Sequence, residues 1–146
     1  MTDEELAKKW EEAQARQQKQ KAMEKERRHK PIPKTIRQRV YKKYNGHCAY
    51  CGKAIAYKDM QVDHIQARYI GGKDNLGNYN PACRACNFYK STMTIDQFRG
   101  ELKKVQGRLR KVFIYRLAVA YGLVEEKDIN VRFYFERSGY RNGSNK

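Results

Sequence analysis

A chain of 146 residues is long enough for one compact domain with an extension. Charged residues make up 33% of it and hydrophobic residues 40%, so a large core is excluded. The formal net charge of +16 excludes a neutral or acidic surface. It favours a polyanionic partner, above all nucleic acid, over the alternatives of a solubility charge or an anionic-membrane contact.

Residues 1–30 are predicted to form a helical or disordered extension. A capping box opens at Thr2, and a helix from there to about His29 would end before the prolines that follow. Nine Lys/Arg stand against seven Asp/Glu in this segment, a net of +2, so residues 31–146 carry the remaining +14. The extension is interpreted either as an arm that contacts DNA or a protein, or as a solvated, non-essential segment.

Four cysteines form two Cys-x-x-Cys pairs. The acidic N-terminus lacks an apolar run and no stretch reaches transmembrane length, so we expect neither a signal peptide nor a membrane contact. Paired Cys-x-x-Cys motifs in such a chain favour metal binding in a reducing cytoplasm over disulfides.

Residues 31–136 are predicted to form the main domain. A second capping box at Thr35 opens a short basic helix over 35–44 with one apolar face. Asn45 and Gly46 tolerate left-handed backbone and end that helix.

The central part of this domain is predicted to be a hairpin, a loop and a helix. Strands over 55–57 and 61–65 would be joined by a tight turn. Residues 66–82 are rich in Gly, Asn and Pro, which predicts a long irregular loop. A short helix is expected over 84–91.

The C-terminal part contains the strongest helical pattern. A third capping box opens a helix over 94–122, which Gly100 and Gly107 could bend or split. Alternating apolar and polar residues predict a strand over 129–135. Residues 137–146 are expected to be a disordered tail.

The two cysteine pairs have the spacing of a metal site. Cys48, Cys51, Cys83 and Cys86 can close a tetrahedral zinc site without an open position, which makes the zinc structural. A redox pair or unrelated free thiols are the alternative, but neither explains two pairs. The interval of 31 residues between the pairs exceeds the roughly 15–20 of a simple zinc ribbon.

The long interval contains His64, which has the chemistry of a general base. Phosphodiester hydrolysis needs a base near neutral pH and a divalent cation beside the phosphate. Asp63 and Asn87 offer the oxygen ligands that magnesium or manganese prefers. Because neighbours in a strand face opposite sides, the strand must end or twist for Asp63 and His64 to serve one phosphate.

These motifs resemble one known family. Val62-Asp63-His64-Ile65, Gly71-Gly72, Asn78 and Cys83-x-x-Cys86-Asn87 with Lys90 are similar to the HNH, or ββα-metal, nucleases, in the subgroup braced by zinc on four cysteines. The resemblance covers about residues 46–91. It implies an α+β fold, with a small zinc-stapled ββα-metal (His-Me finger) core and flanking basic helices.

The resemblance also implies roles for single residues. His64 corresponds to the general base, and Asp63 and Asn87 to ligands of a catalytic Mg²⁺ or Mn²⁺. Asn78 corresponds to the residue that orients the base and its loop, with Asn75 as the alternative for that position. Asn80 and His47 are weaker candidates. The family often has a proline after the Asp-His-Ile run, where this chain has Gln66-Ala67-Arg68.

The implied function is a metal-dependent DNA endonuclease that nicks one strand or both, in a bacterial or phage-infected cell. Basic residues of the domain are expected to hold backbone phosphates: Arg37, Arg39, Lys42, Lys43, Arg68, Lys73, Arg84 and Lys90. The polar side of helix 94–122 is either a further DNA face or a solvated surface.

Two alternatives without catalysis stay open. One is a zinc-stapled nucleic-acid-binding protein, which the charge alone supports. The other is an accessory protein of a larger DNA-processing complex, such as a phage packaging or restriction complex, with residues 1–30 as the docking helix.

Overall fold

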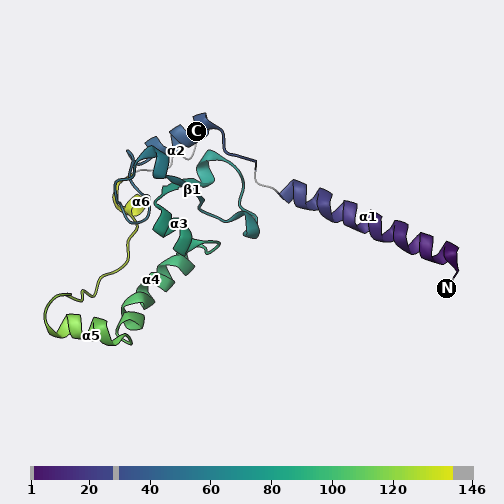
Figure 1. The fold of residues 1–146 in the computed structure, drawn as a ribbon. Helices are drawn as coiled ribbons and strands as arrows, with labels where there is room; N and C mark the ends of the chain where they lie inside the picture. Colours follow the sequence, from purple (N-terminus) through teal and green to yellow (C-terminus); the bar gives the residue numbers. More distant parts are fainter. Residues whose placement is uncertain (1, 28–29, 140–146) are drawn as a thin grey trace. The chain divides into compact units, whose positions relative to one another are not determined.

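The computed structural model describes residues 2–27 and 30–139, and the chain divides into two compact units between Ile32 and Pro33. The first unit contains helix α1, Asp3–Arg27 (Figure 1). Its predicted capping box is confirmed, because the Glu5 amide donates to Thr2 Oγ1 at 3.3 Å and the Thr2 amide to Glu5 Oε2 at 2.9 Å. The predicted continuation over residues 28–29 lies outside the described residues.

The second unit begins with α2, Lys34–Lys42, which buries Val40. The capping box predicted at Thr35 is wrong. The helix begins one residue earlier, next to Pro33, so Thr35 lies inside the first turn and no side chain caps the helix. Asn45 and Gly46 follow with φ of 51° and 74°, the left-handed conformation expected at this helix end.

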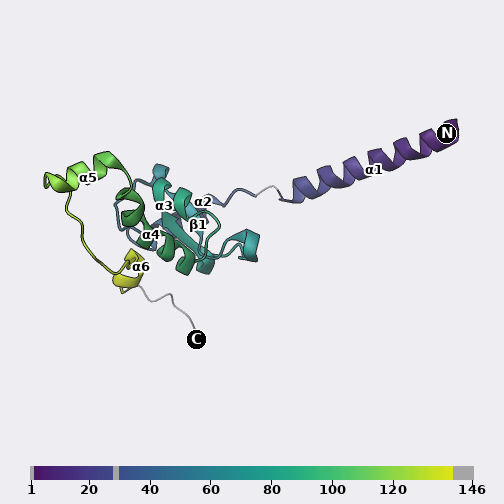
Figure 2. The ribbon, with the colours of Figure 1, turned by 90° about the horizontal axis from the view of Figure 1, so that it is seen from below.

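A two-stranded antiparallel sheet follows α2. Strand β1, Gln61–His64, pairs with β2, Tyr79–Ala82, so that Asp63 lies opposite Asn80 and His64 opposite Tyr79. Helix α3, Arg84–Lys90, starts directly after β2 and packs on β1 (Figures 1 and 2). The order is therefore strand, strand, helix.

The hairpin predicted over 55–57 and 61–65 is wrong. Residues 57–59 form a single 3₁₀ turn, and the Ile55 amide donates to the Gly46 carbonyl at 2.8 Å, so this stretch pairs with the chain before Cys48. The partner of β1 instead lies within the predicted loop 66–82. Pro81 is tolerated there because a sheet of two strands has only edge strands.

The helix predicted over 94–122 is two helices, α4 (Ile95–Leu109) and α5 (Phe113–Ala120). Its capping box at Thr94 is confirmed. The break falls after Leu109 and not at either glycine. The Arg116 guanidinium donates at 3.1 Å to the carbonyls of Arg110 and Lys111, which satisfies backbone acceptors released at the break.

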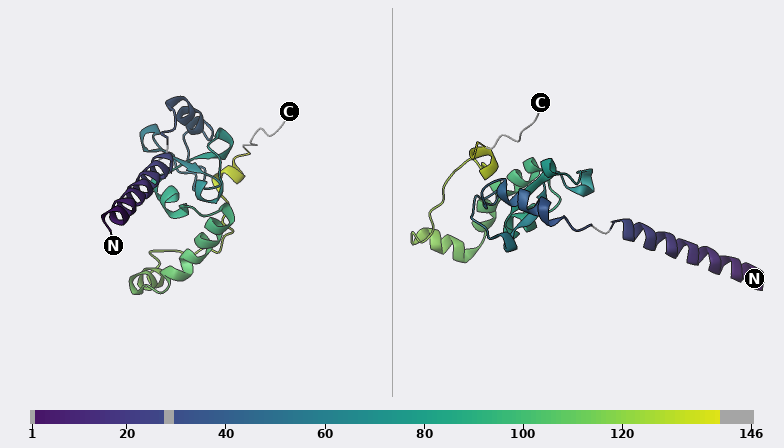
Figure 3. Two further views of the ribbon diagram at one scale, coloured as in Figure 1. Left: turned by 90° about the vertical axis from the view of Figure 1, so that its right-hand side faces the viewer. Right: turned by 90° about the horizontal axis from the view of Figure 1, so that it is seen from above.

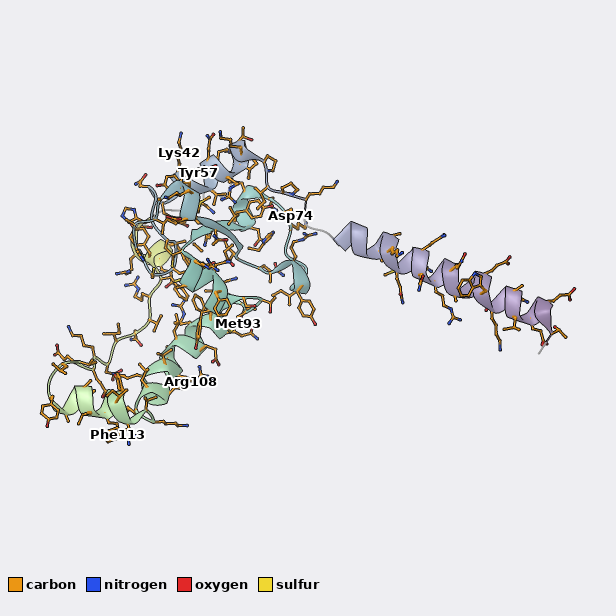
Figure 4. All side chains as sticks on the ribbon, viewed as in Figure 1. Lys42, Tyr57, Asp74, Met93, Arg108 and Phe113 are labelled. Atoms are coloured by element: carbon orange, nitrogen blue, oxygen red, sulfur yellow. The ribbon has the colours of Figure 1, made fainter. Side chains whose placement is uncertain are left out.

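Helix α5 exposes most of its apolar side chains; Phe113, labelled in Figure 4, is 67% exposed. The chain from 123 to 133 then returns without regular structure from α5 to helix α6, Tyr134–Arg137 (Figures 1 and 3). The strand predicted over 129–135 is therefore wrong. The amides of Tyr134 and Phe135 donate to the carbonyls of Tyr50 and Ala49 at 2.9 Å, so this stretch docks on a turn instead of joining a sheet.

The small core lies between the sheet, α4 and the returning chain. Cys48, Tyr50, Ala82, Phe98 and Phe133 are its buried residues. The rings of Phe98 and Phe133 stack at 5.2 Å between centroids, and the Tyr50 ring meets both edge-on. Two distant segments thus meet at the first Cys-x-x-Cys turn. Of the predicted C-terminal tail, residues 140–146 lie outside the described residues.

An ion pair fastens the returning chain to α4. The Arg99 guanidinium contacts both carboxylate oxygens of Glu136 and donates to the Val131 carbonyl at 2.7 Å. Arg99 lowers the pKa of Glu136 below its usual value. The contribution of the pair to stability is therefore present above the ordinary carboxyl pKa and is lost as pH falls through the lowered one.

We expect Glu136→Gln to lower the free energy of unfolding by about 1 kcal/mol at pH 7, because the amide keeps the shape but loses the charge. Chemical denaturation of the metal-loaded protein measures this. Glu125→Gln is the matched control, since Glu125 is exposed and its contact with Lys127 is 3.9 Å long. Equal losses in the two variants would contradict a specific role for Glu136.

Candidate functional site

The four cysteines form one cluster. Their Sγ atoms all lie within 4.8 Å of one another, and Cys51 Sγ is 3.9 Å from Cys83 Sγ. Thiolates about 2.3 Å from a tetrahedral ion would be about 3.8 Å apart. Gly52, with φ of 77°, makes the tight turn after the first pair. The cluster therefore has the donor set and the dimensions to hold a metal ion with all four cysteines.

Tyr50 links this cluster to the sheet. It lies between Cys48 and Cys51 in the chain, and its hydroxyl donates a short hydrogen bond to Asp63 Oδ2. Burial and the neighbouring carboxylate raise the pKa of Tyr50 far above its usual value. The hydroxyl therefore stays protonated and acts as the donor.

Asp63 is buried, with 4% of its surface exposed, and pairs with a fully buried lysine. Lys90 Nζ lies 3.1 Å from Asp63 Oδ2 and 3.3 Å from Oδ1, and it donates to the His64 carbonyl at 2.8 Å. Burial raises the pKa of Asp63, while the Tyr50 hydrogen bond and the Lys90 charge oppose the rise. The three residues fix the carboxylate and the end of β1 in one arrangement.

His64 is the last residue of β1 and directly follows Asp63, so the strand ends at the point where both side chains are needed at one phosphate. Its ring meets Tyr79 edge-on, 5.0 Å between centroids, and Nε2 lies 2.7 Å from Asp74 Oδ1. Arg68 Nε is 3.6 Å from the other oxygen of Asp74. Asp74, labelled in Figure 4, belongs to the loop between the strands. It was not predicted, because nothing in the local sequence ties it to a histidine ten residues earlier.

Asn78 holds this loop closed. Its side chain accepts from the Gln66 amide and donates to the Gln66 and Lys73 carbonyls, all at 2.9 Å. Asn75 instead caps the turn, by accepting from the Asn78 amide at 3.0 Å. Of the two asparagines, Asn78 therefore joins both ends of the loop that carries Asp74 to His64.

Gly72 is required by the same loop closure. A Cβ on this residue would lie 1.7 Å from the Gln66 carbonyl oxygen, closer than any contact permits. The Gly72 amide donates to the Ala67 carbonyl at 3.0 Å. The Gly-Gly pair noted in the sequence thus permits a close approach of two backbone segments.

Asn87 is half-buried on α3, one turn before Lys90. Residues three apart share a helix face, so Asn87 lies on the side of α3 from which Lys90 reaches Asp63. Together, Asp63 and Asn87 offer a carboxylate and an amide oxygen, which suit a hard divalent cation that keeps several waters. Asp63 Oδ1 has lone pairs beyond the one that Lys90 uses. The donor chemistry therefore fits such an ion.

The eight basic residues predicted to bind phosphate differ in their surroundings: four are exposed, two contact other protein groups, and two are buried. Arg39, Lys42, Lys73 and Arg84 are exposed. Arg68 is paired with Asp74, and Arg37 donates to the Met60 carbonyl at 3.1 Å.

Lys43 and Lys90 need a correction. Lys43 Nζ is buried and donates to the Tyr79 carbonyl at 2.8 Å, and Lys90 is buried against Asp63. Both ammonium groups point into the protein, so these two lysines are internal structural groups and not phosphate contacts.

The two weaker candidates also have structural surroundings. Asn80 is 1% exposed and its Oδ1 lies 3.5 Å from Lys43 Nζ. The His47 ring lies within 3.1 Å of the Tyr44 and Asn45 carbonyls and stacks on Tyr134. Neither residue belongs to the group around His64.

Comparison with known proteins gives one family. Residues 48–103 match the family described as HNH endonuclease. No curated protein matches the chain. A solved structure, the Type II-C Cas9 enzyme from Actinomyces naeslundii, aligns with 75% of this chain at 26% identity and a TM-score of 0.44. The chain spans 14% of the length of that enzyme. Within the described residues, none of the helices has the length and apolar character of a membrane span.

Proposed function

From the match of residues 48–103 to the HNH endonuclease family, we propose that this protein hydrolyses DNA phosphodiester bonds with His64 as the general base and a divalent metal ion as cofactor. The observation that carries the assignment of the base is the contact of His64 with Asp74. The hydrolysis produces a nick in one strand, or a double-strand break when both strands are cut.

The Asp74 contact sets the form of His64 that catalysis needs. An ionised carboxylate only accepts hydrogen bonds, so Nε2 of His64 carries the proton that points at Asp74. In a neutral imidazole with Nε2–H, the other nitrogen is the proton acceptor. His64 thus takes a proton from the attacking water through Nδ1, and Asp74 stabilises the positive charge that the ring acquires.

Asp63 and Asn87 are the residues we propose to hold the catalytic cation. When bound, Mg²⁺ or Mn²⁺ supplies positive charge to the phosphate and the leaving 3′ oxygen. The protein's part is to hold the carboxylate in place: Tyr50 contacts its Oδ2 atom, and Lys90 contacts both of its oxygens. Asn78 keeps the loop closed and thereby keeps Asp74 against His64.

Zinc is the ion we propose for the four-cysteine cluster, because zinc favours four thiolates in a tetrahedron. A closed site of this kind has no position for water, so its role is structural. Reduced thiolates suit a reducing compartment, and we propose the cytoplasm as the place where the protein acts.

We assign catalysis to residues 31–136 and partner docking to residues 1–30. Exposed basic side chains of the domain, Arg39, Lys42, Lys73 and Arg84, are the proposed contacts to backbone phosphates. In α1, the side chains of Leu6, Trp10 and Met23 are each at least half exposed, which supports a protein partner for this helix.

A plasmid assay tests the proposal. We expect purified zinc-loaded protein to convert supercoiled DNA to nicked or linear forms with Mg²⁺ or Mn²⁺, and to lack this activity when neither ion is added. Binding of DNA without cleavage under all metal conditions would favour the alternative, a zinc-stapled nucleic-acid-binding protein.

A chain that begins at residue 31 is the control for the extension in the same assay. Equal nicking by both chains supports a docking role for residues 1–30. Loss of nicking with an intact fold would contradict the division between a catalytic domain and a docking arm.

A further inference from the structure

A groove of about 840 Å³ lies beside the sheet, and His64 is not among the residues that line it. One wall is the stretch 53–61 that follows the first cysteine pair, and the other is the outer side of α3. Gln61 at the start of β1 and Cys83 at the start of α3 also line the groove. Both walls therefore begin at the four-cysteine cluster, which ties them together through one metal site.

The groove combines positive charge with an exposed aromatic ring. Lys53, Lys58 and Arg84 line it and are exposed, and Asp59 is the one acidic residue among the lining residues. Phe88 on α3 is 82% exposed, so its ring takes no part in the core. Alanines and Ile55 supply an apolar lining between the charges. An aromatic face beside several cations is the combination with which proteins bind single-stranded nucleic acid.

Helix α3 connects the groove to the catalytic site. Arg84 and Phe88 line the groove, whereas Lys90 reaches Asp63 of β1 from another side of the helix. Asn87 is three residues from both Arg84 and Lys90, so it lies between these two sides. Phe88 directly follows Asn87 in the chain. A strand whose phosphate is held near Asn87 can therefore continue around α3 into the groove.

We propose that this groove binds a single-stranded stretch of DNA next to the cleaved phosphate, with the Phe88 ring stacked on one base. The proposal rests on the proposed nuclease function. Both faces of a base inside a duplex are covered by its neighbours, so a ring that stacks on a base selects nucleotides that are unpaired. The preferred substrate would thus be DNA with a flap, a gap or a branch.

Charge decides against an apolar protein segment as the occupant. Such a segment would bring no negative charge to a groove in which three cations face one acid, Asp59, whereas the phosphates of one strand would neutralise the excess positive charge. An acidic peptide would match the charges but leave the exposed ring without a planar partner. The two classes of ligand can be separated by competition.

The first test measures binding to the zinc-loaded protein without added Mg²⁺ or Mn²⁺, so that no cleavage occurs. We expect Phe88→Ala to weaken binding of a short oligodeoxythymidine about five- to tenfold, and binding of a duplex of equal length less than about twofold. Phe113→Ala is the matched control, because Phe113 is an exposed ring on α5, outside the groove. It should leave both affinities unchanged.

The second test places a fluorescent ring at the same position. Trp10 is the sole tryptophan of the chain and lies in α1, so Phe88→Trp in a Trp10→Phe background carries one tryptophan, at the groove. We expect the oligodeoxythymidine to quench its fluorescence and to bind with wild-type affinity.

Three results would overturn the proposal. These are equal losses of single-stranded and duplex binding in Phe88→Ala, an unquenched tryptophan in the saturated complex, and competition by poly-glutamate as strong as by the oligonucleotide. The last would assign the groove to acidic proteins. Because binding is measured without a catalytic metal, these results are independent of plasmid nicking, which tests the nuclease function itself.

Discussion

Replacement of His64 by alanine is expected to lower the rate of plasmid nicking by about 10²–10⁴-fold, the usual contribution of a general base. The imidazole would be lost, and with it the contact to Asp74 at the end of β1. DNA binding should remain, because His64 is not among the proposed phosphate contacts. The measurement is single-turnover nicking at saturating protein, together with the affinity of the zinc-loaded protein for DNA without added Mg²⁺ or Mn²⁺.

The matched control is His47→Ala, a histidine of the same domain whose ring contacts backbone carbonyls and Tyr134. We expect it to retain nicking per folded molecule to within about threefold, since a residue outside the chemistry gives no general-base contribution. If His64→Ala cuts at the wild-type rate, or if His47→Ala loses as much activity as His64→Ala, the assignment of the base is wrong.

Replacement of Cys51 by serine is expected to unfold residues 33–139 at room temperature. A structural zinc site contributes about 10–16 kcal/mol in small zinc domains. A whole domain is stable by only about 5–15 kcal/mol. Because the core here is small, the free energy lost with the metal exceeds the stability that the remaining contacts provide. Near-ultraviolet circular dichroism and bound zinc per chain measure the effect.

Cys51 is the sharpest position for this test because it is the exposed member of the cluster. If it were a free thiol, serine would cost little there. Ala85→Ser, an exposed change within the second Cys-x-x-Cys pair, is the control and should keep both fold and zinc. A Cys51→Ser protein that melts like the wild type would contradict a structural metal on four cysteines.

The parts of the site that the sequence predicts are those set by short spacings. The spacing of the two cysteine pairs predicts that all four thiols meet at one place, because a tetrahedral ion allows few arrangements of its ligands. Asp63 and His64 are adjacent, so a single short motif identifies both. Helix α3 and the capping box at Thr94 are equally local, and the structure contains both.

The parts that could not be predicted depend on contacts between distant segments. Strand β2 contains Asn80 and Pro81, which indicate a loop, and it becomes a strand only because β1 supplies its hydrogen-bond partners. The contact of Asp74 with His64 exists because Asn78 closes a loop without regular structure. The closure of such a loop produces no helical or strand periodicity in the sequence from which it could be predicted.

Charged side chains show the same limit. A lysine in a basic helix suggests a solvated surface, and Lys43 is instead buried because the Tyr79 carbonyl of β2 lies beneath it. Apolar and polar residues alternate in the returning chain after α5, as they do in a strand. Its amides at Tyr134 and Phe135, however, donate to carbonyls of the turn at Tyr50 and not to a neighbouring strand. In each case the partner comes from another element, and a single segment contains no signal for it.

The buried pair of Asp63 and Lys90 also restricts how this sequence can change during evolution. Removing either charge leaves the other buried and unpaired, at a cost of about 3–5 kcal/mol, so we expect selection against single substitutions at these two positions. A joint change to apolar residues would keep the fold, but it would discard the carboxylate. We therefore expect active relatives to keep a cation where Lys90 stands, although that side chain touches no substrate.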